Sequence, residues 1–320
     1  MHLAHSILRS AHPRNTHESL KMNYLFLIHG LFGNKQNWKS IAAGLATKLD
    51  SPIQPWTLVA MDLPNHGESL YDKDVSSKST LLLSLESMAK SVHQTINSFL
   101  KTETFPGSVN LLGHSLGGKV AMHLALTSST EDSCGKSHGE VVSKSLDPLF
   151  DSESKLIVVD IAPRAHESST ISTYIDCMQR IEHLKMKDKR LIDVIFADVE
   201  QNPSIRQFLM TNLIWNNKDT KDYYRFRTDL SLMKRSLPLL CGFPLDTFNS
   251  VSFKGKTLFI GGTRSDYLAA ADEPIIQRLF PQHVVIRLNT GHWVHSEEPL
   301  QFINTVSQFL LSKNNHVLKS

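Results

Sequence analysis

Residues 113–125 read Gly-His-Ser-Leu-Gly-Gly-Lys-Val-Ala-Met-His-Leu-Ala, and this stretch decides the fold. It follows an apolar run at residues 109–112 and continues in a helical pattern, so Ser115 lies at a turn from a strand to a helix. A serine with glycine two positions away on each side is typical of a tight turn that exposes the hydroxyl. The helix that follows offers unpaired N–H groups and the positive end of its dipole. We therefore predict that Ser115 is a nucleophile and that the Leu116 N–H stabilises an oxyanion.

Short apolar runs on both sides of this stretch alternate with amphipathic segments of helical spacing. The runs cover residues 24–28, 57–61, 109–112, 156–159, 257–260 and 284–286, and residues 2–8 are interpreted as a further strand before them. Continuous runs of β-branched residues and leucine fit strands that are buried on both faces. The sequence therefore predicts an α/β fold, with a mostly parallel central sheet and helices on both faces.

Two segments interrupt this alternation. Residues 128–154 are rich in serine, glycine and charge, which predicts a flexible surface insertion. The second segment has helical periodicity at residues 174–184, 190–199, 205–213 and 224–240, with no strand that joins the sheet. Because it lies between two strands, we interpret it as a helical cap over the edge where open α/β sheets bind ligands. The expected organisation is a first core part at residues 1–162, the cap at residues 163–244 and a second core part at residues 245–320.

A serine hydroxyl is a good nucleophile only when a base removes its proton. With this kind of turn, the base is expected after the last strand of the sheet. Residues 289–293 read Asn-Thr-Gly-His-Trp directly after the last apolar run, so we predict His292 as the base, with Gly291 giving the loop freedom. His295 is the alternative base; otherwise it is expected to be a loop or surface histidine.

The loop after the first long apolar run reads His-Gly-Leu-Phe-Gly at residues 29–33. Its two glycines let the backbone approach a substrate closely, so this loop is expected to supply the second oxyanion donor. We nominate the N–H of Leu31, with the N–H of Phe32 as the adjacent candidate.

Three aspartates qualify by position as the acid that orients the base. Asp160 closes the run at residues 156–159, Asp266 follows the run at residues 257–260, and Asp229 lies in the cap. Asp62 also closes a run, but it precedes Ser115 and is interpreted as a structural residue of the loop after its strand.

The composition excludes several other classes of function. The chain has 320 residues, of which 41% are hydrophobic and 20% charged, and a net charge of +3 from scattered lysines and arginines, so we expect no nucleic-acid partner. Its three cysteines, Cys134, Cys177 and Cys241, lack metal-ligand spacing and predict reduced thiols and no metal site. No stretch is long and apolar enough to span a membrane. The sequence does not indicate an oligomeric state.

Several segments together resemble the α/β-hydrolase superfamily, and within it the family that comprises alpha/beta-hydrolase domain-containing protein 11, bacterial esterases and yeast ethanol acetyltransferases. They lie at residues 29–38, 65–69, 113–119, 159–163, 206–213 and 291–295. The resemblance covers nearly the whole chain, and the Leu-Phe-Gly after His-Gly and the Arg-Gln-x-Leu-x-Thr-Asn-Leu of the cap are distinctive. The chain departs from the family at Pro64, where an arginine is usual, and in its longer 128–154 insertion.

The resemblance implies the α/β-hydrolase fold and assigns the acid to Asp160, with Asp229 near a cap position that has been proposed in the family. It also implies a mitochondrial location as the alternative to a cytoplasmic one. The region before residue 21 has Arg9, Arg14 and only one acidic residue, Glu18, a composition like that of a mitochondrial presequence. We instead interpret the start of this region as a strand and expect a cytoplasmic protein.

The leading hypothesis is a carboxylic ester hydrolase, a serine esterase or thioesterase, that cleaves a small-molecule ester or thioester of a short to medium acyl chain through an acyl-enzyme on Ser115. It requires no metal and no organic cofactor. One alternative is an acyltransferase, in which an alcohol replaces water. Another is a small-molecule receptor that hydrolyses slowly or not at all, which an intact serine and histidine disfavour.

Overall fold

The computed structural model describes residues 1–9, 21–51, 54–71, 80–103, 106–129, 149–216 and 222–312. A seven-stranded sheet with the order β1-β3-β2-β4-β5-β8-β9 forms its centre. These strands are β1 (His5–Arg9), β2 (Met22–Ile28), β3 (Trp56–Met61), β4 (Pro106–His114), β5 (Lys155–Val159), β8 (Lys256–Gly262) and β9 (His283–Leu288). Only β1 runs antiparallel to its neighbour, so the prediction of a mostly parallel sheet is confirmed.

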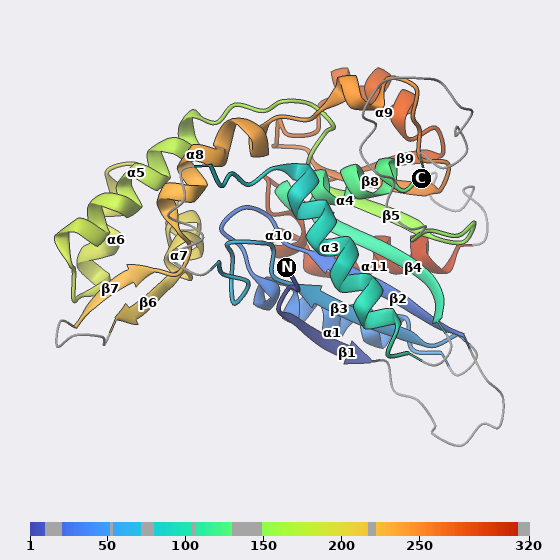
Figure 1. The fold of residues 1–320 in the computed structure, drawn as a ribbon, viewed down its shortest axis with the longest axis horizontal. Helices are drawn as coiled ribbons and strands as arrows, with labels where there is room; N and C mark the ends of the chain where they lie inside the picture. The colour runs from blue at the N-terminus through green and yellow to red at the C-terminus, as the bar shows by residue number, and fades with distance from the viewer. Residues whose placement is uncertain are drawn as a thin grey trace.

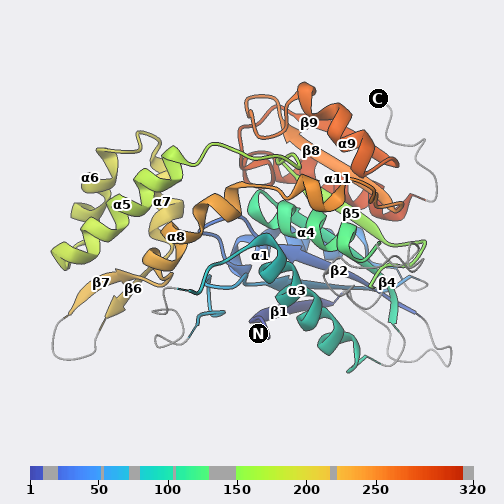
Figure 2. The same ribbon diagram turned by 45° about the horizontal axis from the view of Figure 1, so that its top comes forward.

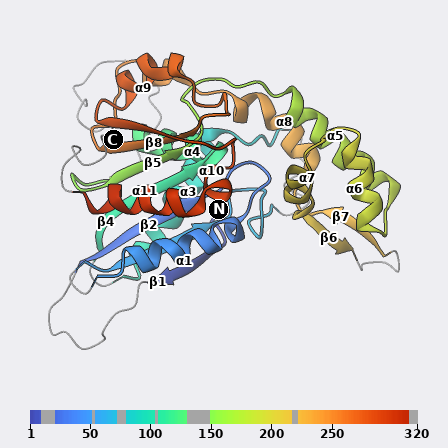
Figure 3. The same ribbon diagram turned by 180° about the vertical axis from the view of Figure 1, so that it is seen from behind.

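Helices cover both faces of the sheet. In Figure 1, α3 (Leu85–Leu100) and α4 (Leu116–Thr127) lie in front of the strands. Figure 3 shows α1 (Lys39–Lys48) and α11 (Pro299–Leu311) on the opposite face. Phe26 belongs to the core under the first pair and its neighbours Leu25 and Leu27 to the core under the second, because alternate side chains of a strand point to opposite faces. The remaining helical elements of the core are η1 (Lys35–Trp38), η4 (Leu245–Phe248), η5 (Ala270–Asp272), α9 (Glu273–Leu279) and α10 (Val294–Glu297).

The described elements between β5 and η4 form a separate group at one end of the molecule (Figures 1 and 2). They are α5 (Ser169–Leu184), α6 (Lys189–Ala197), α7 (Pro203–Met210), β6 (Leu213–Asn216), β7 (Tyr223–Phe226) and α8 (Leu230–Cys241). β6 and β7 pair only with each other in a two-stranded antiparallel sheet, separate from the central one.

The hairpin corrects two of the expected helices. The helix expected over residues 205–213 ends at Met210, and the one expected over residues 224–240 begins at Leu230. Aromatic residues favour a strand here, because Trp215 and Tyr224 pack edge to face across the hairpin with centroids 4.7 Å apart. The side chain of Asp229 caps the N-terminus of α8, which fixes where that helix starts.

Two expectations concern the remaining parts of the chain. Most of the 128–154 insertion lies outside the described residues. Within the described ranges, no helix combines the length and the apolar character that a membrane span requires.

Candidate active site

Ser115 occupies the turn between β4 and α4 in a conformation that few residues adopt. Its φ is 52° and its ψ is −118°. A Cβ atom on Gly117 would lie 2.4 Å from the carbonyl oxygen of Ile28, and one on Gly113 would lie 2.2 Å from the carbonyl oxygen of Gly117. Only glycine fits at these two positions, which is the physical reason for the pattern around the serine.

Asp160 follows β5 directly and is completely buried. Its Oδ2 lies 2.7 Å from Nδ1 of His292, its Oδ1 accepts the N–H of Gly262 at 2.8 Å, and the Ser265 hydroxyl donates to Oδ2. A carboxylate can only accept, so this geometry places the ring proton on Nδ1 and the lone pair of the neutral imidazole on Nε2. The arrangement is that of an acid that orients a base.

The other two candidate acids lie elsewhere. The Asp229 carboxylate accepts the N–H of Leu232 at 2.9 Å as the cap of α8. Asp266 is exposed, and its carbonyl oxygen accepts a bond from Arg164 at 2.9 Å. Of the three aspartates, the structure therefore brings Asp160 to His292.

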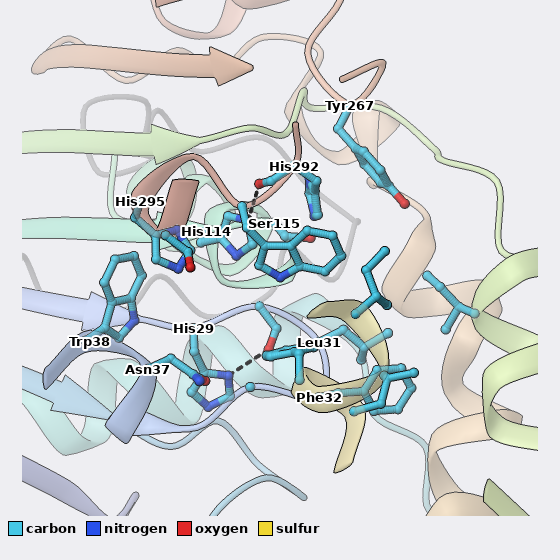
Figure 4. Close-up of a pocket in the computed structure, with 18 of the residues that line it drawn as sticks. His29, Leu31, Phe32, Asn37, Trp38, His114, Ser115, Tyr267, His292 and His295 are labelled. Carbon is cyan, nitrogen blue, oxygen red and sulfur yellow. Dashed lines mark hydrogen bonds between the residues drawn. The ribbon is translucent and has the colours of Figure 1, made fainter. Parts of the chain in front are cut away.

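Aromatic rings hold the His292 imidazole on several sides. Tyr267 stacks on it with a centroid distance of 4.2 Å, and the Nε2 of buried His114 lies 2.9 Å from the His292 carbonyl oxygen (Figure 4). Burial, together with the nearby His292 and His295, keeps the pKa of His114 well below its usual value, so this ring is neutral. Tyr267 and His114 thus fix both the ring and the backbone of the predicted base.

Apart from being the alternative base, His295 was expected to be a loop or surface histidine, and the structure places it elsewhere. It lies in α10 and is buried, with its ring 4.6 Å from that of Trp38 and 4.7 Å from that of His114. Burial, with a smaller contribution from His292, lowers the pKa of His295 to about 3. The ring is therefore neutral and packed among aromatic groups.

The loop at residues 29–33 is fixed from both the core and the chain between β5 and β8. His29 accepts the N–H of Leu63 at 3.0 Å on Nε2 and contacts the Gly30 carbonyl oxygen at 2.8 Å through Nδ1. Phe32 has a φ of 59°, and its carbonyl oxygen accepts a 2.7 Å bond from the buried side chain of Asn212. The backbone around the nominated donor Leu31 is therefore held in place before any substrate binds.

A cavity of about 400 Å³ opens beside Ser115 and His292. Figure 4 shows Leu31, Phe32 and Tyr267 around it, together with the histidines already described. Residues of α5 and α7 also line it, namely Ile171, Tyr174, Ile205, Phe208 and Leu209. The cavity thus joins the predicted nucleophile and base to an apolar space. Among the described residues, no group of three or more histidine, cysteine, aspartate or glutamate side chains is placed to hold a metal ion.

The sequence analysis predicted no positioning role for three residues that contact the site, namely Asn212, Ser265 and Tyr267. Asn212 belongs to the distinctive motif at residues 206–213, and its bond to Phe32 gives that motif a structural reason. Ser265 directly precedes Asp266, and its place beside a candidate acid after a strand was the signal in the sequence that pointed to it. Tyr267 carried no signal in the sequence.

Comparisons with known proteins agree on the fold. Residues 25–305 match the model of the alpha/beta hydrolase family. A Danio rerio protein named sn-1-specific diacylglycerol lipase ABHD11 is 31% identical over 293 residues, covering 89% of this chain and 78% of that protein. A probable alcohol acetyltransferase of Saccharomyces cerevisiae is 27% identical over 320 residues, covering 96% and 83%. The solved structure of a marine microorganism esterase aligns with a TM-score of 0.69 and 26% identity, covering 96% of this chain and 99% of that one.

Proposed function

The chain belongs to the alpha/beta hydrolase family, and we propose that it is a serine hydrolase that cleaves carboxylic esters or thioesters through an acyl-enzyme on Ser115. The observation that carries the proposal is the 2.7 Å contact between His292 Nδ1 and buried Asp160, beside the cavity that Ser115 lines. A carboxylate that fixes the Nδ1 tautomer leaves Nε2 free to act as a base. The relatives named as a lipase and as an esterase support an ester as substrate.

In the proposed reaction, the Ser115 hydroxyl oxygen attacks the acyl carbon while His292 Nε2 takes its proton. The N–H groups of Leu31 and Leu116 stabilise the oxyanion, and the Leu116 N–H is free for this because the first N–H groups of a helix have no acceptor within it. Protonated His292 then gives its proton to the leaving oxygen or sulfur. Water, deprotonated by His292, attacks the acyl-enzyme; the bond from the acyl carbon to Ser115 Oγ breaks, His292 returns the proton to that oxygen, and the acid leaves.

We also propose that residues 163–244 act as a cap on a core made of residues 1–162 and 245–320. Support comes from α5 and α7, which contribute apolar residues such as Ile171 and Phe208 to the large cavity. A substrate with a substantial apolar part fits such walls best.

Covalent labelling tests the nucleophile directly. A fluorophosphonate probe is expected to label the full chain, and Ser115→Ala is expected to abolish labelling. Ser296→Ala is the matched control, because it removes another serine that lines the large cavity, and it is expected to label like the wild type. Labelling that persists in Ser115→Ala would point to another nucleophile and contradict the proposal.

Acyl transfer to an alcohol is a second candidate, and the similarity to a probable alcohol acetyltransferase over 96% of the chain favours it. Both reactions share the acyl-enzyme and differ only in what attacks it. Adding ethanol to an ester assay separates them: a transferase forms the ethyl ester in preference to the acid, and a hydrolase forms the acid.

A further inference from the structure

A second, smaller cavity also reaches Ser115. Its volume is about 40 Å³, against about 400 Å³ for the large cavity. Four residues line both spaces, namely Leu31, Ser115, Ile171 and Tyr267. Ser115 therefore lies where the two cavities meet. An ester bound to Ser115 can place its acyl chain in one cavity and its alcohol part in the other, and the two cavities differ greatly in size.

The small cavity is mostly apolar. Leu116, Ile161 and Leu240 line it, together with the four shared residues. Its one amine, that of Lys119, is already engaged, because Nζ donates to the carbonyl oxygens of Cys241 at 2.6 Å and Gly242 at 3.0 Å. Exposed Glu167 also lines it and marks where it meets solvent. His166 also lines the small cavity, and burial lowers the pKa of its ring to about 4, so that ring is neutral. Among the described residues that line it, the small cavity therefore offers an alkyl group an apolar space and offers a charged group no free cation.

The position of His292 determines which part of an ester enters which cavity. The leaving oxygen or sulfur must lie within hydrogen-bond reach of the ring that protonates it. His292 lines the large cavity and does not line the small one. Given the proposed serine-hydrolase function, we infer that the small cavity binds the acyl chain and the large cavity binds the alcohol or thiol part.

The volumes of the two cavities limit the size of the acyl chain and of the alcohol or thiol part. A single water needs about 10–15 Å³ of such space, so the small cavity holds about three non-hydrogen atoms. That is the alkyl part of acyl groups from acetyl to butanoyl, so a longer chain exceeds the volume of the small cavity. The inferred substrates are short-chain esters or thioesters of a bulky, mainly apolar alcohol or thiol.

A series of 4-nitrophenyl esters tests this assignment, because only the acyl chain varies. For the wild-type chain, kcat/KM is expected to fall at least about tenfold from the butanoate to the octanoate. Leu240→Ala enlarges the small cavity and is expected to raise the octanoate-to-butanoate ratio of kcat/KM about tenfold. Phe208→Ala, the matched control in the large cavity, is expected to leave that ratio unchanged.

The opposite pattern would overturn the inference: a ratio raised by Phe208→Ala and unchanged by Leu240→Ala places the acyl chain in the large cavity. If Leu240→Ala does not fold, Cys241→Met provides a second test because it narrows the small cavity. This variant is expected to hydrolyse the butanoate more slowly relative to the acetate than the wild type does. An unchanged ratio of the two rates would contradict the inference. A chain that is labelled at Ser115 but prefers octanoate would overturn this inference alone. A chain with no ester hydrolysis and no labelling would overturn the proposed function as well.

Discussion

The carboxyl ends of β3 and β5 carry the same residue in two different environments. Asp62 and Asp160 each follow a parallel strand directly, and each is completely buried. Asp62 accepts bonds from the Lys35 ammonium at 2.8 Å, the Lys35 N–H at 2.6 Å and the Glu68 N–H at 2.9 Å. Asp160 accepts bonds from the Gly262 N–H, the Ser265 hydroxyl and the His292 ring.

The difference lies in the charged partner. Lys35 stays protonated, since the pKa of its ammonium is raised: burial lowers it, but the bonds to Asp62 and Glu68 outweigh the burial. The Asp62 pair therefore holds a constant charge and fixes a loop. Asp160 instead bonds to the imidazole of His292, the predicted base, beside the cavity that Ser115 lines. Two aspartates that look alike in the sequence thus differ in role because of what folds against them.

The largest expected effect comes from Asp160→Asn. The amide cannot stabilise a protonated His292 and favours the wrong ring tautomer, so kcat for an ester should fall by about 10⁴. Thermal unfolding of the variant should stay close to that of the wild type, which separates loss of chemistry from loss of fold. Asp229→Asn and Asp266→Asn are the matched controls and should retain turnover. Loss of turnover in either control, but not in Asp160→Asn, would assign the acid elsewhere.

Sequence patterns predicted the mostly parallel sheet, but by themselves they left three aspartates open as the candidate acid. Ser115 and His292 are predicted from local patterns, since each lies at a defined place relative to a strand. Asp160 depends on sheet order: β5 and β8 are neighbours in parallel register, with Val159 opposite Ile260. That pairing brings Asp160 beside Gly262, about a hundred residues later in the chain, and no local pattern contains it.

Local patterns also failed where tertiary contacts override them. The helix predicted over residues 224–240 included Tyr224 to Phe226, yet pairing with β6 makes this segment part of a strand. His295 was expected to be the alternative base or else a loop or surface histidine, yet it is buried. Its burial depends on Trp38, which lies some 250 residues earlier in the chain and packs against it only in the folded state.

Asp62→Asn should change stability rather than chemistry. The substitution leaves the nearly buried Lys35 ammonium without its buried partner, so the free energy of unfolding should fall by about 3 kcal/mol. Turnover at saturating ester should change by less than about tenfold, since the Asp62 carboxylate bonds to Lys35 and Glu68 and not to His292. Urea unfolding and ester hydrolysis at neutral pH measure the two quantities. An Asp62→Asn variant that is as stable as the wild type but has lost turnover would contradict the structural role of Asp62 and its difference from Asp160.

The pKa of Asp62 determines how the loss of unfolding free energy in Asp62→Asn depends on pH. Burial raises that pKa, but the bonds from the Lys35 ammonium and from the N–H groups of Glu68 and Lys35 lower it overall. A carboxyl with a lowered folded pKa contributes stability above its unfolded pKa of about 3.9 and loses it as the pH falls through the folded pKa. The difference in unfolding free energy between wild type and Asp62→Asn should therefore shrink below about pH 4. A difference that grows on acidification would contradict the assigned direction.

Ser265→Ala should have a smaller effect on the Asp160 site. Without the hydroxyl, the carboxylate keeps the Gly262 N–H but loses a donor to the same oxygen that contacts His292, so its alignment is weaker. One hydrogen bond to a charged group is worth about 1.5 kcal/mol, which corresponds to about a tenfold lower kcat with little change in KM. Ser265→Thr, which keeps the hydroxyl, should restore most of the rate. Equal losses in both variants would mean that the residue acts through packing.

Glu68→Gln should have the smallest effect, because it removes the exposed partner of the Asp62 site. The Glu68 side chain contacts the Lys35 ammonium at 2.8 Å but is 66% exposed, whereas Asp62 is completely buried. Exposed ion pairs contribute at most about 1 kcal/mol and are screened by salt, so the loss in unfolding free energy should be small and should vanish in about 1 M salt. Catalysis should be unchanged, because Lys35 keeps its bonds to Asp62. If Glu68→Gln instead costs as much stability as Asp62→Asn, the lysine depends on both carboxylates equally, and burial would no longer explain why the Asp62 pair is structural.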